Sequence, residues 1–255
     1  MLNFEALNLK EEILHAVQDM GFTEATPIQE QAIPIALTGQ DVIGQAQTGT
    51  GKTAAFAIPF LQLISNDPVV QVLILTPTRE LCIQVEKEVK KLSKYMRLKS
   101  VAVYGGQDIT RQIRELKARP QIIVATPGRL MDHYKHHSID ISHVTQIVLD
   151  EADEMLNMGF YKDVRHIIEM MKARKSLSMF SATISREVMD IGWLYQHNAE
   201  EITVQPKEES QPKITQYMLE TSGRNKLSDL AQIIIGENYK RVMVFCDTKF
   251  NTATL

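Results

Sequence analysis

The segment Ala46-Gln47-Thr48-Gly49-Thr50-Gly51-Lys52-Thr53 follows an apolar run and precedes a helical pattern. In such a strand–loop–helix unit, glycines let successive backbone N–H groups converge on phosphate oxygens, and the helix N-terminus adds partial positive charge. We therefore predict a phosphate-binding loop, with Ala46 in place of the usual first glycine. Lys52 would reach the β- and γ-phosphates of a nucleotide, and the Thr53 hydroxyl would coordinate Mg²⁺. The alternative is a glycine-rich turn that carries a lysine by chance.

Apolar runs alternate with helical patterns along the chain. Strands are expected at residues 41–45, 70–76, 99–104, 121–125, 146–149, 178–180 and 201–204. Helices are expected at residues 9–20, 28–37 and 79–94, and between the later strands. This alternation predicts an α/β fold, in which a parallel sheet has helices on both faces. Ligands of such sheets bind at the carboxyl ends of the strands, which is where the glycine-rich loop lies.

A second candidate site follows the apolar run Ile147-Val148-Leu149. The residues that come next are Asp150-Glu151-Ala152-Asp153. An acidic residue at a strand end is the usual second half of a P-loop NTPase, so Asp150 would hold Mg²⁺ through water. Glu151 would orient or deprotonate the attacking water. The alternative is a solvated acidic turn that caps the next helix.

Several segments, taken in order, resemble the DEAD-box RNA helicases, and the likeness extends from about Phe4 to the last residue. Besides the acidic tetrapeptide at 150–153, the matching segments are Gly21-Phe22 with Thr26-Pro27-Ile28-Gln29, Pro77-Thr78-Arg79-Glu80-Leu81, Gly105-Gly106, Thr126-Pro127-Gly128-Arg129, Ser181-Ala182-Thr183, and Val242-Met243-Val244-Phe245 with Asp247-Thr248. Ala25 stands where the family usually has proline. The resemblance implies a RecA-like P-loop NTPase domain and an ATP-dependent RNA helicase that couples ATP hydrolysis to local duplex unwinding.

The resemblance also assigns roles to individual residues. ATP is expected to contact Phe4, Thr26, Gln29, Gln47, Thr48, Gly49, Thr50, Gly51, Lys52 and Thr53. The RNA backbone is expected to contact Pro77, Thr78, Arg79, Gly105, Gly106, Thr126, Pro127, Gly128 and Arg129. The catalytic residues are expected to be Lys52, Asp150 and Glu151, with Ser181 and Thr183 coupling hydrolysis to unwinding, and Mg²⁺ is expected on Thr53 and Asp150.

The chemistry of these side chains fits the roles, although alternatives remain. The Gln29 amide carries a donor and an acceptor together, which matches the N6 and N7 edge of adenine and disfavours guanine. Phe4 would stack on the base, or instead anchor the first helix in the core. Backbone N–H groups, hydroxyls and arginines bind phosphate and sugar without reading base sequence. Arg79 could instead be solvated, and Gly105-Gly106 could be an ordinary turn.

The chain is expected to contain one complete domain and part of another. The polar segment 205–213 has two prolines and no apolar run, so we predict domains at 1–205 and 214–255, joined by a linker at 206–213. The second is expected to be the incomplete start of another RecA-like domain, with strands at 214–219 and 241–246 and a helix at 225–235. Because the family's second-domain arginines are absent, we expect the isolated chain to be nearly inactive. Two further functions stay open, namely an ATP- and RNA-binding module without turnover and a P-loop NTPase of another class.

Composition and charge exclude few kinds of binding partner, but they indicate the cellular compartment. The net charge is −3, from 28 basic and 31 acidic residues, which argues against a binder that relies on bulk positive charge. The two cysteines are far apart and form no metal-binding pair, which indicates a reducing compartment. There is no signal-peptide pattern and no apolar run of about 20 residues, so we expect a cytoplasmic protein without a membrane span. His133, His136 and His137 are expected to form a solvated helix end.

Overall fold

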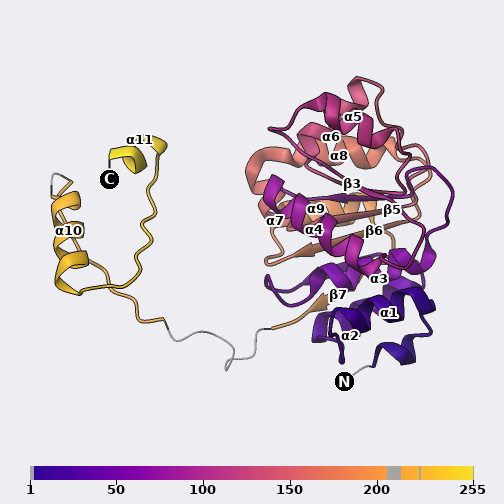
Figure 1. The fold of residues 1–255 in the computed structure, drawn as a ribbon, viewed down its shortest axis with the longest axis horizontal. Coiled ribbons are helices and arrows are strands. Elements are labelled where there is room, and N and C mark those ends of the chain that lie inside the picture. The colour runs from indigo at the N-terminus through magenta and orange to yellow at the C-terminus, as the bar shows by residue number, and fades with distance from the viewer. Residues whose placement is uncertain (1–2, 206–213, 224, 255) are drawn as a thin grey trace. The chain divides into compact units, whose positions relative to one another are not determined.

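The computed structural model describes residues 3–205, 214–223 and 225–254 (Figure 1). The chain separates into two compact units, Met1–Glu208 and Glu209–Leu255, and each is considered by itself. The predicted linker at 206–213 lies outside the described residues.

The larger unit is built on a parallel sheet, and all seven predicted strands form it. Their bounds are β1 Val42–Gln45, β2 Val72–Leu75, β3 Ser100–Val103, β4 Ile122–Ala125, β5 Gln146–Asp150, β6 Ser176–Ser181 and β7 Glu200–Thr203. The strand order is β3-β4-β2-β5-β6-β1-β7, and every neighbouring pair is parallel.

Helices connect these strands and cover both faces of the sheet (Figure 1). Their bounds are α1 Glu11–Asp19, α2 Pro27–Leu37, α3 Lys52–Leu63, α4 Arg79–Leu92, α5 Ile109–Leu116, α6 Pro127–Lys135, α7 Ala152–Met155, α8 Tyr161–Met170 and α9 Arg186–Tyr195, with a 3₁₀ turn at Phe4–Leu7 and a π-helical turn at Leu156–Phe160. Side-chain caps begin several of them. Thr78 accepts from the N–H of Leu81 at α4, and Ser185 accepts from the N–H of Val188 at α9.

Alternate residues of the inner strands enter two separate apolar cores. Val72 and Ile74 of β2 pack into the core that contains residues of α1, α2, α3 and α4. Leu73 and Leu75 of the same strand pack into the core that contains residues of α6, α7, α8 and α9. Successive side chains of a strand point to opposite faces, so both faces of this sheet are buried. The predicted α/β fold with helices on both faces is confirmed.

Close packing holds the middle of the sheet together. A Cβ added at Gly44 of β1 would lie 2.7 Å from the ring of Phe180 on β6, so only glycine fits there. At the other end of the same strands, buried Asp41 accepts from the N–H of Leu177 at 2.6 Å and from the N–H of His197 at 2.8 Å. One carboxylate therefore joins the start of β1 to β6 and to the turn before β7.

The smaller unit differs from the prediction. Its described helices are α10 Lys226–Gly236, as expected, and α11 Lys249–Thr254. The strands predicted at 214–219 and 241–246 are wrong, because those residues have no strand pairing. Their large apolar side chains are exposed, including Tyr217, Met218 and Phe245. Two strands and one helix bury too little apolar surface to hold a sheet, which explains the missing ladder.

None of the helices in the described ranges is long and apolar enough to cross a bilayer.

Candidate nucleotide and nucleic-acid site

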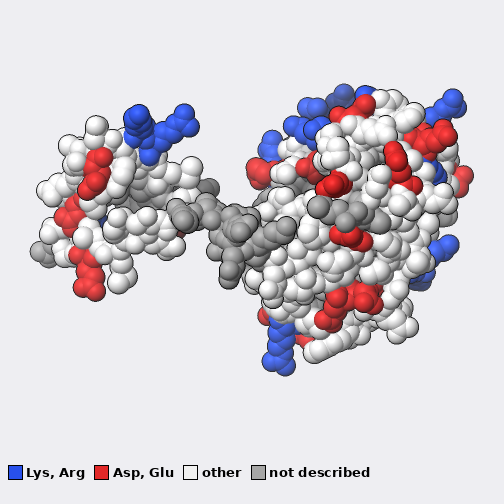
Figure 2. All heavy atoms as spheres, turned by 90° about the horizontal axis from the view of Figure 1, so that it is seen from below, with Lys and Arg blue, Asp and Glu red and all other residues white. Residues whose placement is uncertain are grey.

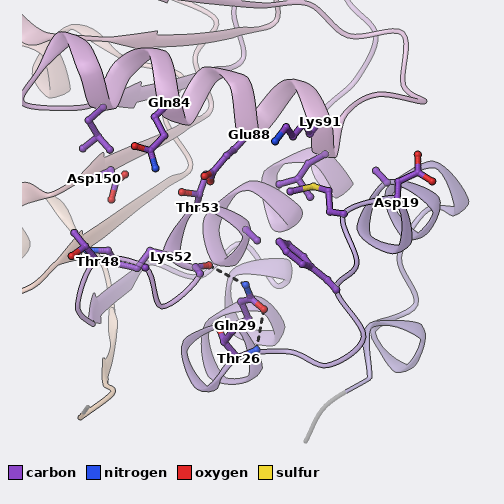
Figure 3. Close-up of a pocket in the computed structure, with 18 of the residues that line it drawn as sticks. Asp19, Thr26, Gln29, Thr48, Lys52, Thr53, Gln84, Glu88, Lys91 and Asp150 are labelled. Carbon is purple, nitrogen blue, oxygen red and sulfur yellow. Dashed lines mark hydrogen bonds between the residues drawn. The ribbon is translucent and has the colours of Figure 1, made fainter. Parts of the chain in front are cut away.

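A cavity of about 990 Å³ lies where β1 and β5 end, and it contains most of the residues predicted to bind a nucleotide. The glycine-rich loop contributes Thr48, Gly49, Gly51, Lys52 and Thr53. The lining also includes Thr26 and Gln29 at the start of α2, Gln84 and Glu88 of α4, and Asp150 and Glu151 at the carboxyl end of β5 (Figure 3). Helices and loops far apart in the sequence therefore meet at one edge of the sheet.

The loop has the backbone shape that its glycines predict. Gly49 and Gly51 have φ values of 80° and 92°, in the left-handed region that favours glycine. A Cβ at Gly51 would also collide with the Gln29 amide nitrogen. Thr50 and Gln47 do not line the cavity. Instead the Thr50 hydroxyl donates to the Gln47 carbonyl at 2.7 Å and closes the loop on itself.

The predicted lysine and glutamate are in direct contact. Lys52 Nζ lies 2.9 Å from Glu151 Oε1, although the residues are 99 positions apart in the sequence. The two side chains are only 6% and 14% exposed, so the pair is well shielded from solvent. Glu151 has a φ of 50°, an uncommon conformation for a residue other than glycine. The strand ends bring a cation and a candidate base together at the floor of the cavity.

Asp150 is the most deeply buried acidic group of the site. Burial raises the pKa of its carboxyl to about 7, the Lys52 ammonium opposes this rise, and the Glu151 carboxylate adds to it. One of its oxygens accepts from the Glu151 N–H at 3.1 Å. A divalent cation would favour the charged carboxylate. In protein sites Mg²⁺ commonly takes one or two carboxylates, with phosphates and water completing the shell. The donor set of Asp150 and Thr53 fits that requirement. Among the described residues no cluster of three or more metal-ligating side chains exists.

Gln29 links the start of α2 to the phosphate loop. Its amide oxygen accepts from the Thr26 N–H at 3.0 Å, and its amide nitrogen donates to the Gly51 carbonyl at 3.1 Å (Figure 3). Each end of the amide retains one further hydrogen or lone pair, so a paired contact with a base is still available. The Thr26 hydroxyl is buried beside Gly51 without a protein partner. These unused polar groups fit a polar ligand at this end of the cavity.

The structure places Phe4 in the core instead of on the cavity wall. Its ring is 3% exposed and stacks on Phe22, with centroids 6.4 Å apart. This position agrees with the second role considered for Phe4, in which its ring anchors the first helix in the core. Phe22 lines the cavity, and it belongs to Gly21-Phe22, one of the segments that resemble the helicase family. Phe22 therefore presents apolar surface to the cavity, and the Phe4 ring packs against it.

Ser181 and Thr183 contact a residue that the sequence reasoning did not assign to the site. The Asp153 N–H donates to the Ser181 hydroxyl at 3.1 Å. The Asp153 carboxylate accepts from the Thr183 N–H at 2.9 Å and from its hydroxyl at 2.6 Å. Neither Ser181 nor Thr183 lines the cavity. They join the end of β6 to the end of β5. Asp153 could have been predicted from the sequence, because it is the last residue of the acidic tetrapeptide at 150–153.

The segments predicted to bind RNA occupy the other half of the same sheet edge. They follow β2, β3 and β4, which adjoin one another in the sheet. The Arg79 guanidinium lies over the Tyr104 ring at 5.1 Å, and its Nη1 would be 3.5 Å from a Cβ added at Gly106. Arg79 is thus held by neighbouring segments at the edge. The sheet brings these predicted segments together beside the nucleotide cavity.

Arg129 is also held by protein contacts, and a buried histidine lies near it. Its Nη1 donates to the Gln107 carbonyl at 2.9 Å, and the side chain is 14% exposed. His133 is fully buried, so the prediction of a solvated end for it is wrong, whereas His136 and His137 are exposed. Burial lowers the pKa of His133, and the nearby Arg129 adds to this effect. The histidine lies on the inner face of α6, where it packs toward α5.

Surface charge does not mark a nucleic-acid surface on the face shown in Figure 2. Acidic side chains lie across the middle of the larger unit and basic side chains lie toward its rim. This mixture agrees with the net charge of −3. The assignment of a nucleic-acid surface therefore rests on individual residues and their backbone neighbours.

Comparison with known proteins agrees with this geometry. The sequence profile of the DEAD/DEAH box helicase family matches residues 26–191. The chain is 44% identical over 250 residues to DEAD-box ATP-dependent RNA helicase CshA of Geobacillus kaustophilus, covering 98% of this chain and 54% of that protein. It is 46% identical over 252 residues to ATP-dependent RNA helicase CshA of Listeria monocytogenes, covering 98% of this chain and 48% of that protein. The chain thus spans about half the length of the curated relatives it matches.

Solved structures show the same fold. A DEAD box protein from Methanococcus jannaschii aligns with a TM-score of 0.77 and 38% identity, over 100% of this chain and 69% of that one. A hypothetical ATP-dependent RNA helicase from Sulfolobus tokodaii aligns with a TM-score of 0.73 and 40% identity, over 77% of this chain and 57% of that one. The glycine-rich loop, the acidic tetrapeptide and the segments after β2, β3 and β4 lie at one edge of the sheet. Because the family profile also covers most of the larger unit, the chain belongs to the DEAD/DEAH box helicase family.

Proposed function

We propose that this chain is the nucleotide-binding and RNA-binding part of an ATP-dependent RNA helicase of the cytoplasm. The observation that carries the proposal is the division of one sheet edge. The shielded Lys52–Glu151 pair and Asp150 occupy the half formed by β1, β6 and β5, and Arg79 and Arg129 follow β2 and β4 in the adjoining half. The names of the relatives, which are 44–46% identical, support the same activity.

In the nucleotide half, the backbone N–H groups of 48–53 would bind phosphate oxygens at the start of α3. Lys52 would leave Glu151 and bind the β- and γ-phosphates, because two or three phosphates offer more negative charge than one carboxylate. That exchange would free Glu151 to orient the attacking water. Thr53 and Asp150 would hold Mg²⁺, which supplies charge stabilisation to the phosphates when bound.

In the base-binding region, the remaining hydrogen and lone pair of the Gln29 amide would pair with N7 and N6 of adenine. Guanine presents an acceptor where adenine presents the N6 donor, so the same amide would discriminate against it. Because Gln29 also holds Gly51 and Thr26, base binding and phosphate-loop shape would depend on the same side chain.

In the RNA half, the residues assigned to RNA would bind phosphate and sugar groups of one strand. They offer guanidinium groups, hydroxyls and glycine N–H groups, which position a backbone and read no bases. We propose that the bound RNA is therefore not selected by sequence. A P-loop NTPase of another class fits less well, because the segments after β2, β3 and β4 match the RNA helicase family.

Residues 214–255 are proposed to begin a second RecA-like domain, because 242–248 resemble the family's first segment of that domain. For residues 1–255 by themselves we propose binding of ATP and RNA with little turnover. Among the described residues that line the cavity there is no arginine to stabilise charge that develops on the γ-phosphate. The full helicase would take that arginine from the rest of the second domain.

Replacing the loop lysine tests the phosphate site. Lys52→Ala is expected to weaken MgATP binding by about 10- to 100-fold, since a hydrogen bond to a charged group contributes about 1.5–3 kcal/mol. Isothermal calorimetry measures this directly. Lys90→Ala, which removes an exposed lysine paired with Glu86 on α4, serves as the control and should bind normally. An unchanged affinity for Lys52→Ala would contradict the phosphate-loop assignment.

Base recognition is tested by the ratio of two affinities. Gln29→Ala should weaken ATP by about 1–3 kcal/mol through lost hydrogen bonds and should erase the preference for ATP over GTP. Loss of the Gly51 contact weakens both nucleotides equally, so the ATP-to-GTP ratio isolates base reading from loop support. Wild-type protein that binds GTP as tightly as ATP would show that Gln29 does not read adenine.

RNA binding should be dominated by phosphate contacts. Fluorescence anisotropy with unrelated single-stranded oligonucleotides should give similar affinities that fall as salt rises. Each neutralised phosphate contributes about −0.7 to the slope of log affinity against log salt. Arg79→Ala and Arg129→Ala should each flatten that slope by about 0.7. Strong discrimination among base sequences would count against backbone recognition.

The division of the ATP site between two domains is tested by steady-state turnover. The chain of residues 1–255 should bind MgATP but hydrolyse it slowly, with or without RNA. A chain extended to the length of its relatives should recover RNA-stimulated hydrolysis, by roughly 10³–10⁵-fold if the missing group is an arginine. Robust RNA-stimulated turnover by residues 1–255 would show that the site is complete without more of the second domain.

A further inference from the structure

A buried glutamine joins the segments that follow β3 and β4. Gln112 lies on α5 and is fully buried. Its amide nitrogen donates to the Tyr104 carbonyl and to the Gln107 side-chain oxygen, each at 2.9 Å. Its amide oxygen lies 2.9 Å from Nε2 of His133 and 3.5 Å from Nη1 of Arg129. All four hydrogen-bonding positions of this amide are therefore occupied.

These contacts lie on both sides of Gly105-Gly106, the glycine pair predicted to bind RNA. Tyr104 and Gln107 flank Gly105-Gly106, and both residues are anchored by Gln112. Gln107 is anchored a second time, through its carbonyl, by Arg129. Glycines have no side chain with which to hold their own loop, so the shape of this turn depends on its flanks. The same amide therefore restrains the turn after β3 and the arginine after β4.

His133 fixes the orientation of the glutamine amide. Because the amide nitrogen faces two acceptors, the amide oxygen must face His133, and the Nε2 of His133 must carry the hydrogen. The Nδ1 of His133 lies 2.7 Å from the Ser138 hydroxyl, whose one hydrogen has Nδ1 and the His133 carbonyl, at 3.0 Å, as its two acceptors. A neutral imidazole satisfies both contacts. This arrangement leaves the Arg129 guanidinium with one nitrogen, Nη2, that no protein acceptor takes among the described residues.

We propose that Gln112, oriented by His133, is a positioning residue for RNA. It presets the Gly105-Gly106 turn and the Arg129 guanidinium so that both meet one RNA backbone. The inference rests on the proposed RNA-binding function, and it adds residues that contact no RNA themselves. Preorganisation raises affinity because the loop and the arginine are not ordered anew on binding.

The test is a double-mutant cycle on the chain of residues 1–255, with RNA affinity measured by anisotropy over a range of salt concentrations. Gln112→Met keeps the length of the side chain and removes its four polar contacts. It should weaken RNA about tenfold and flatten the salt slope by about 0.7, as Arg129→Ala does. The double variant should be weaker than Arg129→Ala alone by clearly less than tenfold, because the two changes share the Arg129 contact and only the disturbance of the glycine turn is added. MgATP affinity should stay unchanged.

Two further variants separate positioning from loss of stability. Gln121→Met removes a buried amide at the opposite end of β4, where Gln121 accepts from the Lys99 N–H at 2.9 Å and donates to the Asp67 carbonyl at 3.2 Å. It should leave RNA affinity and the salt slope unchanged. His133→Leu removes the contact that orients the amide, together with the contact between Nδ1 and Ser138, and leaves the Gln112 side chain in place. It should weaken RNA binding in the same direction as Gln112→Met but by less, so it serves as the test variant if Gln112→Met fails to fold.

The outcomes are distinguishable. Independent effects of Gln112→Met and Arg129→Ala, or equal losses from Gln121→Met, would overturn the positioning role while the RNA-binding function stands. Wild-type chain that binds no RNA would overturn the proposed function and this inference with it.

Discussion

Parallel pairing of β6 with both β1 and β5 is the arrangement on which the nucleotide site depends. It aligns the carboxyl ends of three strands, so the loop after β1 and the acidic residues at the end of β5 face each other. Gly44 permits the close approach to Phe180 that this pairing needs. The Lys52–Glu151 contact and the Asp153–Thr183 contacts follow from this alignment, since each joins residues from different strand ends.

Two buried glutamines have comparable positions in the two halves of the sheet edge. Gln29 ties the start of α2 to the phosphate loop, and Gln112 ties the glycine turn after β3 to α6. A neutral amide can donate and accept at once without the cost of burying a charge, which suits it to hold two loops together. Pairing of β2 with β5 places the two halves side by side in one sheet. Each half is thus shaped before a ligand arrives.

Much of the fold was predictable because its signals are local. Strands such as β2 and β4 are short apolar runs between polar turns, and the loop at 46–53 carries its own glycines and lysine. The predictions failed where partners from distant segments matter. The segments 214–219 and 241–246 read as strands, but strands require neighbours that hydrogen-bond to them. His133 reads as part of a polar helix end, but the packing of α6 toward α5 turns it inward.

Residue type and spacing along the chain were enough to indicate the α/β class, the phosphate loop, the acidic pair after β5 and the family. These features depend on the types of residues that lie a few positions apart in the sequence, so a short segment is enough to indicate them. The contacts within the site required the folded chain. The pairing of Lys52 with Glu151, the choice of Phe22 over Phe4 at the cavity, and the place of Gln112 beneath the glycine turn each depend on strand order and helix packing. Strand order brings together groups that are 99 positions apart, as in the Lys52–Glu151 pair, and 156 positions apart, as in the Asp41–His197 contact. No local sequence pattern specifies which strands become neighbours.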